Sequence, residues 1–135
     1  MSARSVVLAL LCGGSLAAAG CPSPEGPVAG DLEVRVVSPN LDDRAILLRL
    51  HGRQTAVAAP SGSGYQVLVA PYRADTVTVL VMAPRGQHLL AGAIVRVSVP
   101  DTRQVDAYLA RPLDVASTAY LQRALTGYTL AVAKP

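Results

Sequence analysis

Short runs of alternating apolar and polar residues constrain the fold of this 135-residue chain more than any other feature. In the clearest run, residues 76–83, every second residue from Val77 to Val81 is valine. A period of two residues indicates a strand with one buried face. Seven further runs have the same character: residues 31–38, 44–50, 54–59, 65–70, 89–99, 104–110 and 128–133.

Pro, Gly, Asn and Asp separate these runs, at a spacing of about 8–12 residues that is typical of β-sandwiches. The sequence therefore predicts an all-β domain over residues 31–135, a single antiparallel β-sandwich of about seven to nine strands. Residues 54–59 are small and end at Pro60, so we expect them to form a short edge strand. Near residues 117–125 the period changes, and a short helix that ends at Gly127 is expected there, with a strand as the alternative.

The composition agrees with a β domain that is held together by its apolar core and not by a disulfide. The chain contains no Trp and no Phe, so Val, Leu, Ile, Ala and the five Tyr must fill its core. Its two cysteines, Cys12 and Cys21, both lie near the N-terminus. We find no internal repeat and no second composition regime, which favours one domain.

The first 20 residues are typical of an export signal. Arg4 is the only charged residue before Glu25, and an apolar stretch and a stretch of small residues follow it. The apolar stretch is too short to span a bilayer of about 30 Å as a helix. This pattern predicts an exported protein.

The signal closes on the segment LAAAGC at residues 16–21, which resembles the lipobox of bacterial lipoproteins. Ala18 stands where that family favours Leu or Val. The resemblance implies that Cys21 is lipidated and becomes the N-terminus, so that membrane lipid is a partner and the cell envelope is the location. Residues 21–30, rich in Pro and Gly, would be a flexible tether. The alternatives are a secretory signal cut after Ala19 and a retained N-terminal anchor.

The segment LAGAIVRVSVP at residues 90–100 and the order of the strands resemble the cohesin and carbohydrate-binding sandwiches of extracellular bacterial proteins. The resemblance covers about residues 31–111 and extends to immunoglobulin-like sandwiches in general. It implies a module that binds a partner or supports a structure.

The sequence lacks the residue patterns that nucleic-acid binding, metal binding and catalysis require. The basic residues are scattered, so nucleic-acid binding is not expected. His51 and His88 are too few for a zinc site, and Asn40, Asp42 and Asp43 are typical of a turn rather than of a calcium loop. No nucleophile elbow or catalytic carboxylate pair is present, so we expect no enzyme, no cofactor and no metal.

The tyrosines are the remaining candidates for recognition. Tyr72 beside Arg73 in a predicted turn, and Tyr108 on a predicted outward face, are the candidate binding residues, whereas Tyr65 and Tyr128 are expected to pack inside. The sequence thus predicts a membrane-anchored envelope lipoprotein with a non-catalytic binding or structural module. Its partner would be an envelope protein or a glycan. The alternative is a secreted or surface carbohydrate-binding domain.

Overall fold

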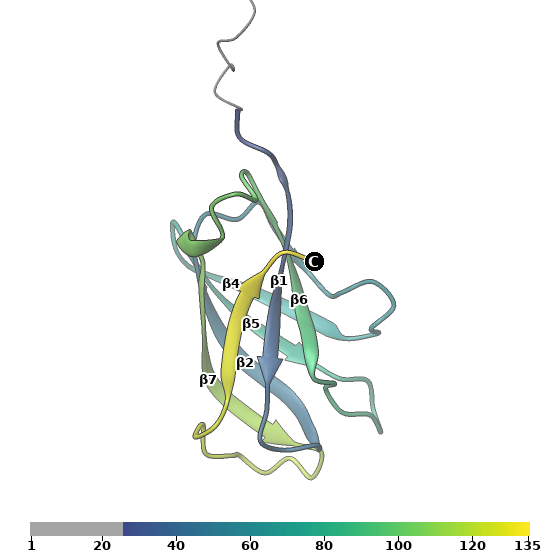
Figure 1. The fold of residues 1–135 in the computed structure, drawn as a ribbon. Coiled ribbons are helices and arrows are strands. Elements are labelled where there is room, and N and C mark those ends of the chain that lie inside the picture. The colour runs from purple at the N-terminus through teal and green to yellow at the C-terminus, as the bar shows by residue number, and fades with distance from the viewer. Residues whose placement is uncertain (1–25) are drawn as a thin grey trace, which may run out of the picture.

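The computed structural model describes residues 26–135 as two antiparallel sheets of four strands each that face one another (Figure 1). Residues 1–25, and with them Cys21 and most of the predicted tether, lie outside the described residues. The first sheet has the order β3-β6-β1-β8 and the second the order β4-β5-β2-β7. The strands are β1 (Gly30–Val37), β2 (Asp43–His51), β3 (Ala56–Ala58), β4 (Gln66–Arg73), β5 (Thr76–Met82), β6 (Gly92–Val99), β7 (Leu109–Ser117) and β8 (Thr129–Ala133). The predicted all-β sandwich is confirmed.

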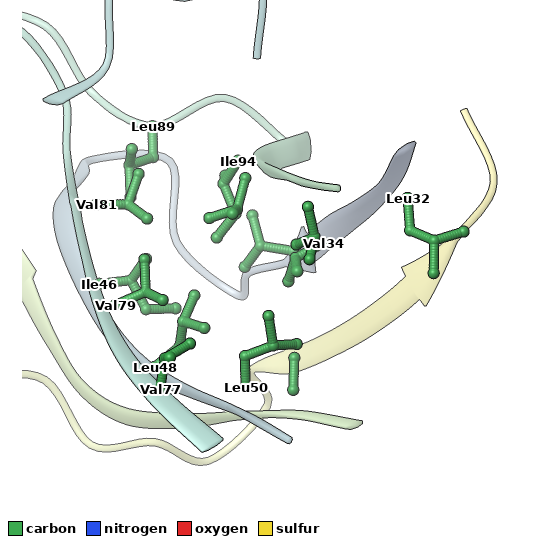
Figure 2. Packing of buried hydrophobic residues seen from close by; sticks show 14 of the residues in the cluster. Leu32, Val34, Ile46, Leu48, Leu50, Val77, Val79, Val81, Leu89 and Ile94 are labelled. Atoms are coloured by element: carbon green, nitrogen blue, oxygen red, sulfur yellow. The ribbon is translucent and has the colours of Figure 1, made fainter. Parts of the chain in front are cut away.

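The core lies between the two sheets, where the apolar side of each alternating run faces its counterpart (Figure 2). Leu32 and Val34 of β1 in the first sheet, and Leu48 of β2 and Val79 of β5 in the second sheet, are all fully buried. Burying each such side chain contributes about 1.5–3 kcal/mol. Residues 26–135 contain no cysteine and therefore no disulfide, so this apolar layer holds the described part of the chain together.

The pairing of β1 with β6 shifts by one residue, between Val34 and Arg35. Ile94 is left without a partner opposite it, and Ile94 and Val95 are both buried although they are adjacent. Such a bulge turns two consecutive side chains toward the core and bends the strand.

The strand pairing defines two ends of the sandwich. Gly30 pairs with Val99, and the C-terminus lies beside them, so both ends of the described chain are at one end of the domain, the tether end (Figure 1). The tether end also holds the loops at residues 52–55, 74–75 and 100–108. The opposite, or far, end holds the loops at residues 38–42, 59–65, 83–91 and 118–128.

The expected helix near residues 117–125 is wrong. β7 continues to Ser117, whose hydroxyl oxygen accepts hydrogen bonds from the backbone N–H groups of Ala119 and Leu121. The chain folds back on itself and pairs Ala116 with Gln122. Because Ser117 takes up these amides, they are not available to a helix.

The boundaries of the strand expected over residues 104–110 are also wrong. A single 3-10 turn, η1 (Val105–Ala107), occupies its first half, and β7 begins only at Leu109. The second half of β7 was not predicted because Pro112 and Asp114 interrupt its pattern. Proline is tolerated there because β7 is an edge strand. The expected edge strand in residues 54–59 is confirmed as β3.

Candidate recognition surface at the far end

A cavity of about 140 Å³ opens between the sheets at the far end. Its apolar wall is formed by Val36, Ile46, Leu89 and Val115, which come from β1, β2, the loop at residues 83–91 and β7. Leu41, Leu90 and Ala91 form its apolar rim, and its polar lining consists of Ser38, Asn40, Asp43, His88 and Tyr128. Four elements distant in the sequence therefore build one hollow.

Asp43, the first residue of β2, is the centre of the polar lining and is only 4% exposed. Tyr128 Oη donates a hydrogen bond of 2.7 Å to Asp43 Oδ1, and Ser38 Oγ donates to Asp43 Oδ2. Asn40 Nδ2 donates in turn to Tyr128 Oη, over 2.8 Å. Because these groups satisfy one another, the cavity offers its occupant mainly apolar surface.

Arg123 closes the network from the loop at residues 118–128. Its Nε lies 3.0 Å from Asp43 Oδ1 as an ion pair, although the N–H is not directed at an acceptor, and its Nη2 pairs with Asp42. Both carboxylates predicted to shape the turn are thus engaged by side chains of the domain itself. Among residues 26–135, no group of three His, Cys, Asp or Glu residues is placed to hold a metal ion.

Backbone hydrogen bonds fasten the neighbouring loops to the start of β2. Asp43 O accepts from Leu89 N over 2.7 Å, and Asp42 O accepts from Thr118 N over 2.8 Å. The floor of the cavity is therefore tied to loops on both sides of it. A site whose walls are fixed in this way loses little conformational entropy when it binds.

Exposed apolar side chains gather at the same end of the domain as the cavity, and two of them, Leu41 and Leu90, line it. Of the twelve large hydrophobic residues exposed within residues 26–135, six belong to the far end: Val37, Leu41, Leu90, Tyr120, Leu121 and Leu125. Leu41 is 88% exposed and Leu90 is 62% exposed. Apolar groups gathered on loops at one end of a domain are typical of an interaction site.

Burial raises the pKa of Tyr128, and its hydrogen bond to the Asp43 carboxylate raises it further. Burial is also the first cause of the raised pKa of Tyr108. A folded state that holds its phenol protons more tightly than the unfolded chain loses stability as the pH rises past the ordinary pKa of 10.0. Both tyrosines are thus phenols, not phenolates, in the neutral range.

The structure separates the predicted binding residues. Tyr72 is 52% exposed at the tether end, and the guanidinium carbons of Arg49 and Arg73 lie 4.0 and 5.3 Å from its ring centre. The expectation that Tyr108 faces outward is wrong, since it is 9% exposed and its Oη donates to the backbone oxygen of Arg53. The 3-10 turn before Tyr108 breaks the period of two and directs its ring inward. Cys21 lies outside the described residues.

Tyr128 was predicted to pack inside, and its burial is confirmed, but its part in a polar network was not predicted. Asp43 and Tyr128 are separated by 85 residues in the chain. The only signal for Asp43 in the sequence was a pair of acidic residues in a turn.

No known protein family, curated protein or solved structure matches this chain. Among residues 26–135, no helix is long and apolar enough to cross a membrane.

Proposed function

We propose that this chain is an envelope lipoprotein, held on a membrane through acylated Cys21, whose sandwich is a non-catalytic module that binds a protein partner with its far end. One observation carries the proposal: the chain enters the domain at the end opposite the cavity and its apolar rim. An anchor at Cys21 would leave the far end free for a partner.

The length of the segment between Cys21 and the domain is compatible with a domain that is anchored at its tether end. The eight residues of positions 21–28 can span at most about 26–29 Å. Val28 is held at the tether end, because its backbone N–H donates to Asp101 Oδ1 and its carbonyl accepts from Thr102 N. Each buried methylene of an acyl chain would contribute about 0.8 kcal/mol to anchoring, so several chains on Cys21 would hold the domain firmly.

The size of the cavity favours a protein partner over a small molecule. Small-molecule sites occupy about 300–1,000 Å³. A cavity of about 140 Å³ is close to the ~150 Å³ of an apolar cavity that admits benzene. One aliphatic or aromatic side chain of a partner would fill it, which is how buried anchor residues act in protein interfaces.

Within the sandwich folds, we propose a relationship to the immunoglobulin-like and cohesin-like group. The neighbours β4-β5-β2 and β3-β6 have the order of strands D-E-B and C-F in a constant-type immunoglobulin domain. In that domain strand A lies beside strand B, whereas here β7 lies beside β2.

Carbohydrate binding is the alternative, and Tyr72 with Arg73 is the candidate that remains of the residues predicted for it, since Tyr108 is buried. It is supported by the exposure of the Tyr72 ring, although Arg49 lies over that ring. Glycan binding that is lost in Tyr72→Ala would support this site, whereas glycan binding that survives Tyr72→Ala would exclude Tyr72 as the site.

Intact mass measurement of the membrane-extracted protein, beside a Cys21→Ser variant, tests the anchor. We expect a wild-type mass equal to residues 21–135 plus diacylglycerol and acyl chains, and no such mass in the variant. A wild-type chain without lipid, recovered from the soluble fraction, would contradict the proposal.

A further inference from the structure

We propose that β4 pairs edge to edge with the β4 strand of a second copy of this chain, joining two four-stranded sheets into one. β4 is an outer strand of the second sheet and is eight residues long. The outward backbone groups of such an edge are a template for another strand. The inference does not depend on whether Cys21 is lipidated.

The charge pattern of the chain favours a second copy as the occupant. Residues 54–72 contain no Asp, Glu, Lys or Arg, although 16% of the whole chain is charged. This segment holds β3 and all of β4 except Arg73. Two copies of an edge without charge can approach one another without repulsion, whereas charged side chains are the usual protection against this contact.

The other edges of the sandwich are protected. β7 carries Arg111, Pro112 and Asp114, and it packs against β8, the edge of the other sheet on that side. β3 is only three residues long. β4 has a proline and a bulge near its last residues, Pro71 and Arg73, but residues 66–70 have neither.

The side chains of β4 are exposed on both of its faces. Leu68 is 50% exposed, and Val69, on the alternate face, is 42% exposed. Val67 packs against the core, but the three residues of β3 do not extend far enough to cover the rest of the inner face of β4. A second β4 strand would cover apolar surface at Leu68 and Val69 and would pair the open backbone groups.

The position of Arg73 sets the direction of the pairing. A parallel pair would place the two Arg73 side chains side by side, where like charges repel. An antiparallel pair places them at opposite ends of the joint and gives a two-fold interface in which the same surface meets itself. The two-fold axis then lies within residues 66–70.

A cysteine scan of the full exported chain tests the pairing in the cells that produce it. Single variants Gln66→Cys, Val67→Cys, Leu68→Cys, Val69→Cys and Ala70→Cys are oxidised in place and examined on non-reducing gels. In an antiparallel pair only the residue at the axis meets its own copy within the Cα separation of about 4.4–6.8 Å that a disulfide needs. We therefore expect one maximum of dimer within residues 66–70.

The wild-type chain controls for Cys21, and Leu113→Cys on β7, which is 36% exposed, controls for random collision. No dimer at any scanned position, an equal yield at Leu113→Cys, or a disulfide to a different protein would each overturn the proposal. As a second readout, Leu68→Lys should lower the dimer fraction of the purified protein at least about tenfold in sedimentation, whereas Leu113→Lys should leave it unchanged. An unchanged dimer fraction in Leu68→Lys would also overturn it.

Discussion

A buried tyrosine lies at each end of the sandwich, and the two have different surroundings. Tyr108 at the tether end packs its ring against Gly52, where an added Cβ would lie 2.4 Å from Tyr108 Cδ1. Tyr128 at the far end lines a cavity of about 140 Å³ and donates to the carboxylate of Asp43. The ring of Tyr108 fills the core at the tether end, whereas the ring of Tyr128 leaves a cavity beside it at the far end.

The loops around the two tyrosines also differ: those at the tether end are joined by hydrogen bonds, and those at the far end carry exposed apolar side chains. At the tether end, the Asp101 carboxylate accepts hydrogen bonds from Arg103 and from the backbone of Val28. At the far end, Leu41 and Leu90 project into solvent beside the cavity. The comparison teaches that an aromatic ring closes the core at the tether end, whereas at the far end the core stays open beside exposed leucines, which is the arrangement that the proposed recognition site needs.

The largest effect is expected from Tyr108→Ala. Removing a large buried aromatic side chain costs about 3–5 kcal/mol, because the cavity left behind collapses only partly. The free energy of unfolding from urea titration measures the loss. A loss below about 1 kcal/mol would show that Tyr108 does not plug the tether end.

Gly52→Ala tests the same plug from the other side. Gly52 has φ of 122°, and its new Cβ would collide with the ring of Tyr108. Backbone strain of about 1–3 kcal/mol and overpacking of similar size add to one another. Gly92→Ala is the matched control, since its φ is 110° but nothing lies within 4 Å of the added Cβ. We expect Gly52→Ala to unfold at a clearly lower urea concentration than Gly92→Ala.

Two hydroxyl deletions compare the ends directly. Tyr128→Phe removes a hydrogen bond to a buried carboxylate and should cost about 2 kcal/mol. Tyr108→Phe removes one to the Arg53 carbonyl and should cost about 1 kcal/mol. Urea unfolding of both variants at neutral pH gives the order. Equal losses, or the reverse order, would mean that the Asp43 network contributes less than its geometry indicates.

Acid should weaken the tether end selectively. The side-chain hydrogen bond from Arg103 lowers the pKa of Asp101 from 3.8 to about 2, against the opposing effect of burial. A folded-state pKa below the unfolded one stabilises the fold at pH values above 3.8, and this contribution is lost as the pH falls toward 2. The Tm difference between the wild type and Asp101→Asn should therefore narrow between pH 4 and pH 2. A constant difference would contradict this role for Asp101.

The sequence predicted the strands that have one buried and one exposed face. Their period of two is visible in neighbouring residues and does not depend on contacts with distant parts of the chain. They failed where a single turn changed the period. The 3-10 turn Val105–Ala107 shifts the period, so that Tyr108 points inward and not outward as predicted. Ser117 accepts a backbone hydrogen bond from Leu121, and the chain reverses direction there where a helix was predicted. The cavity could not be predicted at all, since its walls come from four elements and depend on a contact between Asp43 and Tyr128.

The smallest effect on stability, and the most direct test of the account, comes from the exposed surface. A photo-crosslinking amino acid at Leu90, 62% exposed at the far end, is compared in producing cells with one at Tyr72, 52% exposed at the tether end. Exposed positions of this kind change stability by less than about 0.5 kcal/mol. We predict a discrete adduct from position 90 that disappears when Ala91→Trp fills the mouth of the cavity, and none from position 72. An adduct from position 72 alone, or one from position 90 that persists in Ala91→Trp, would contradict recognition through the far end.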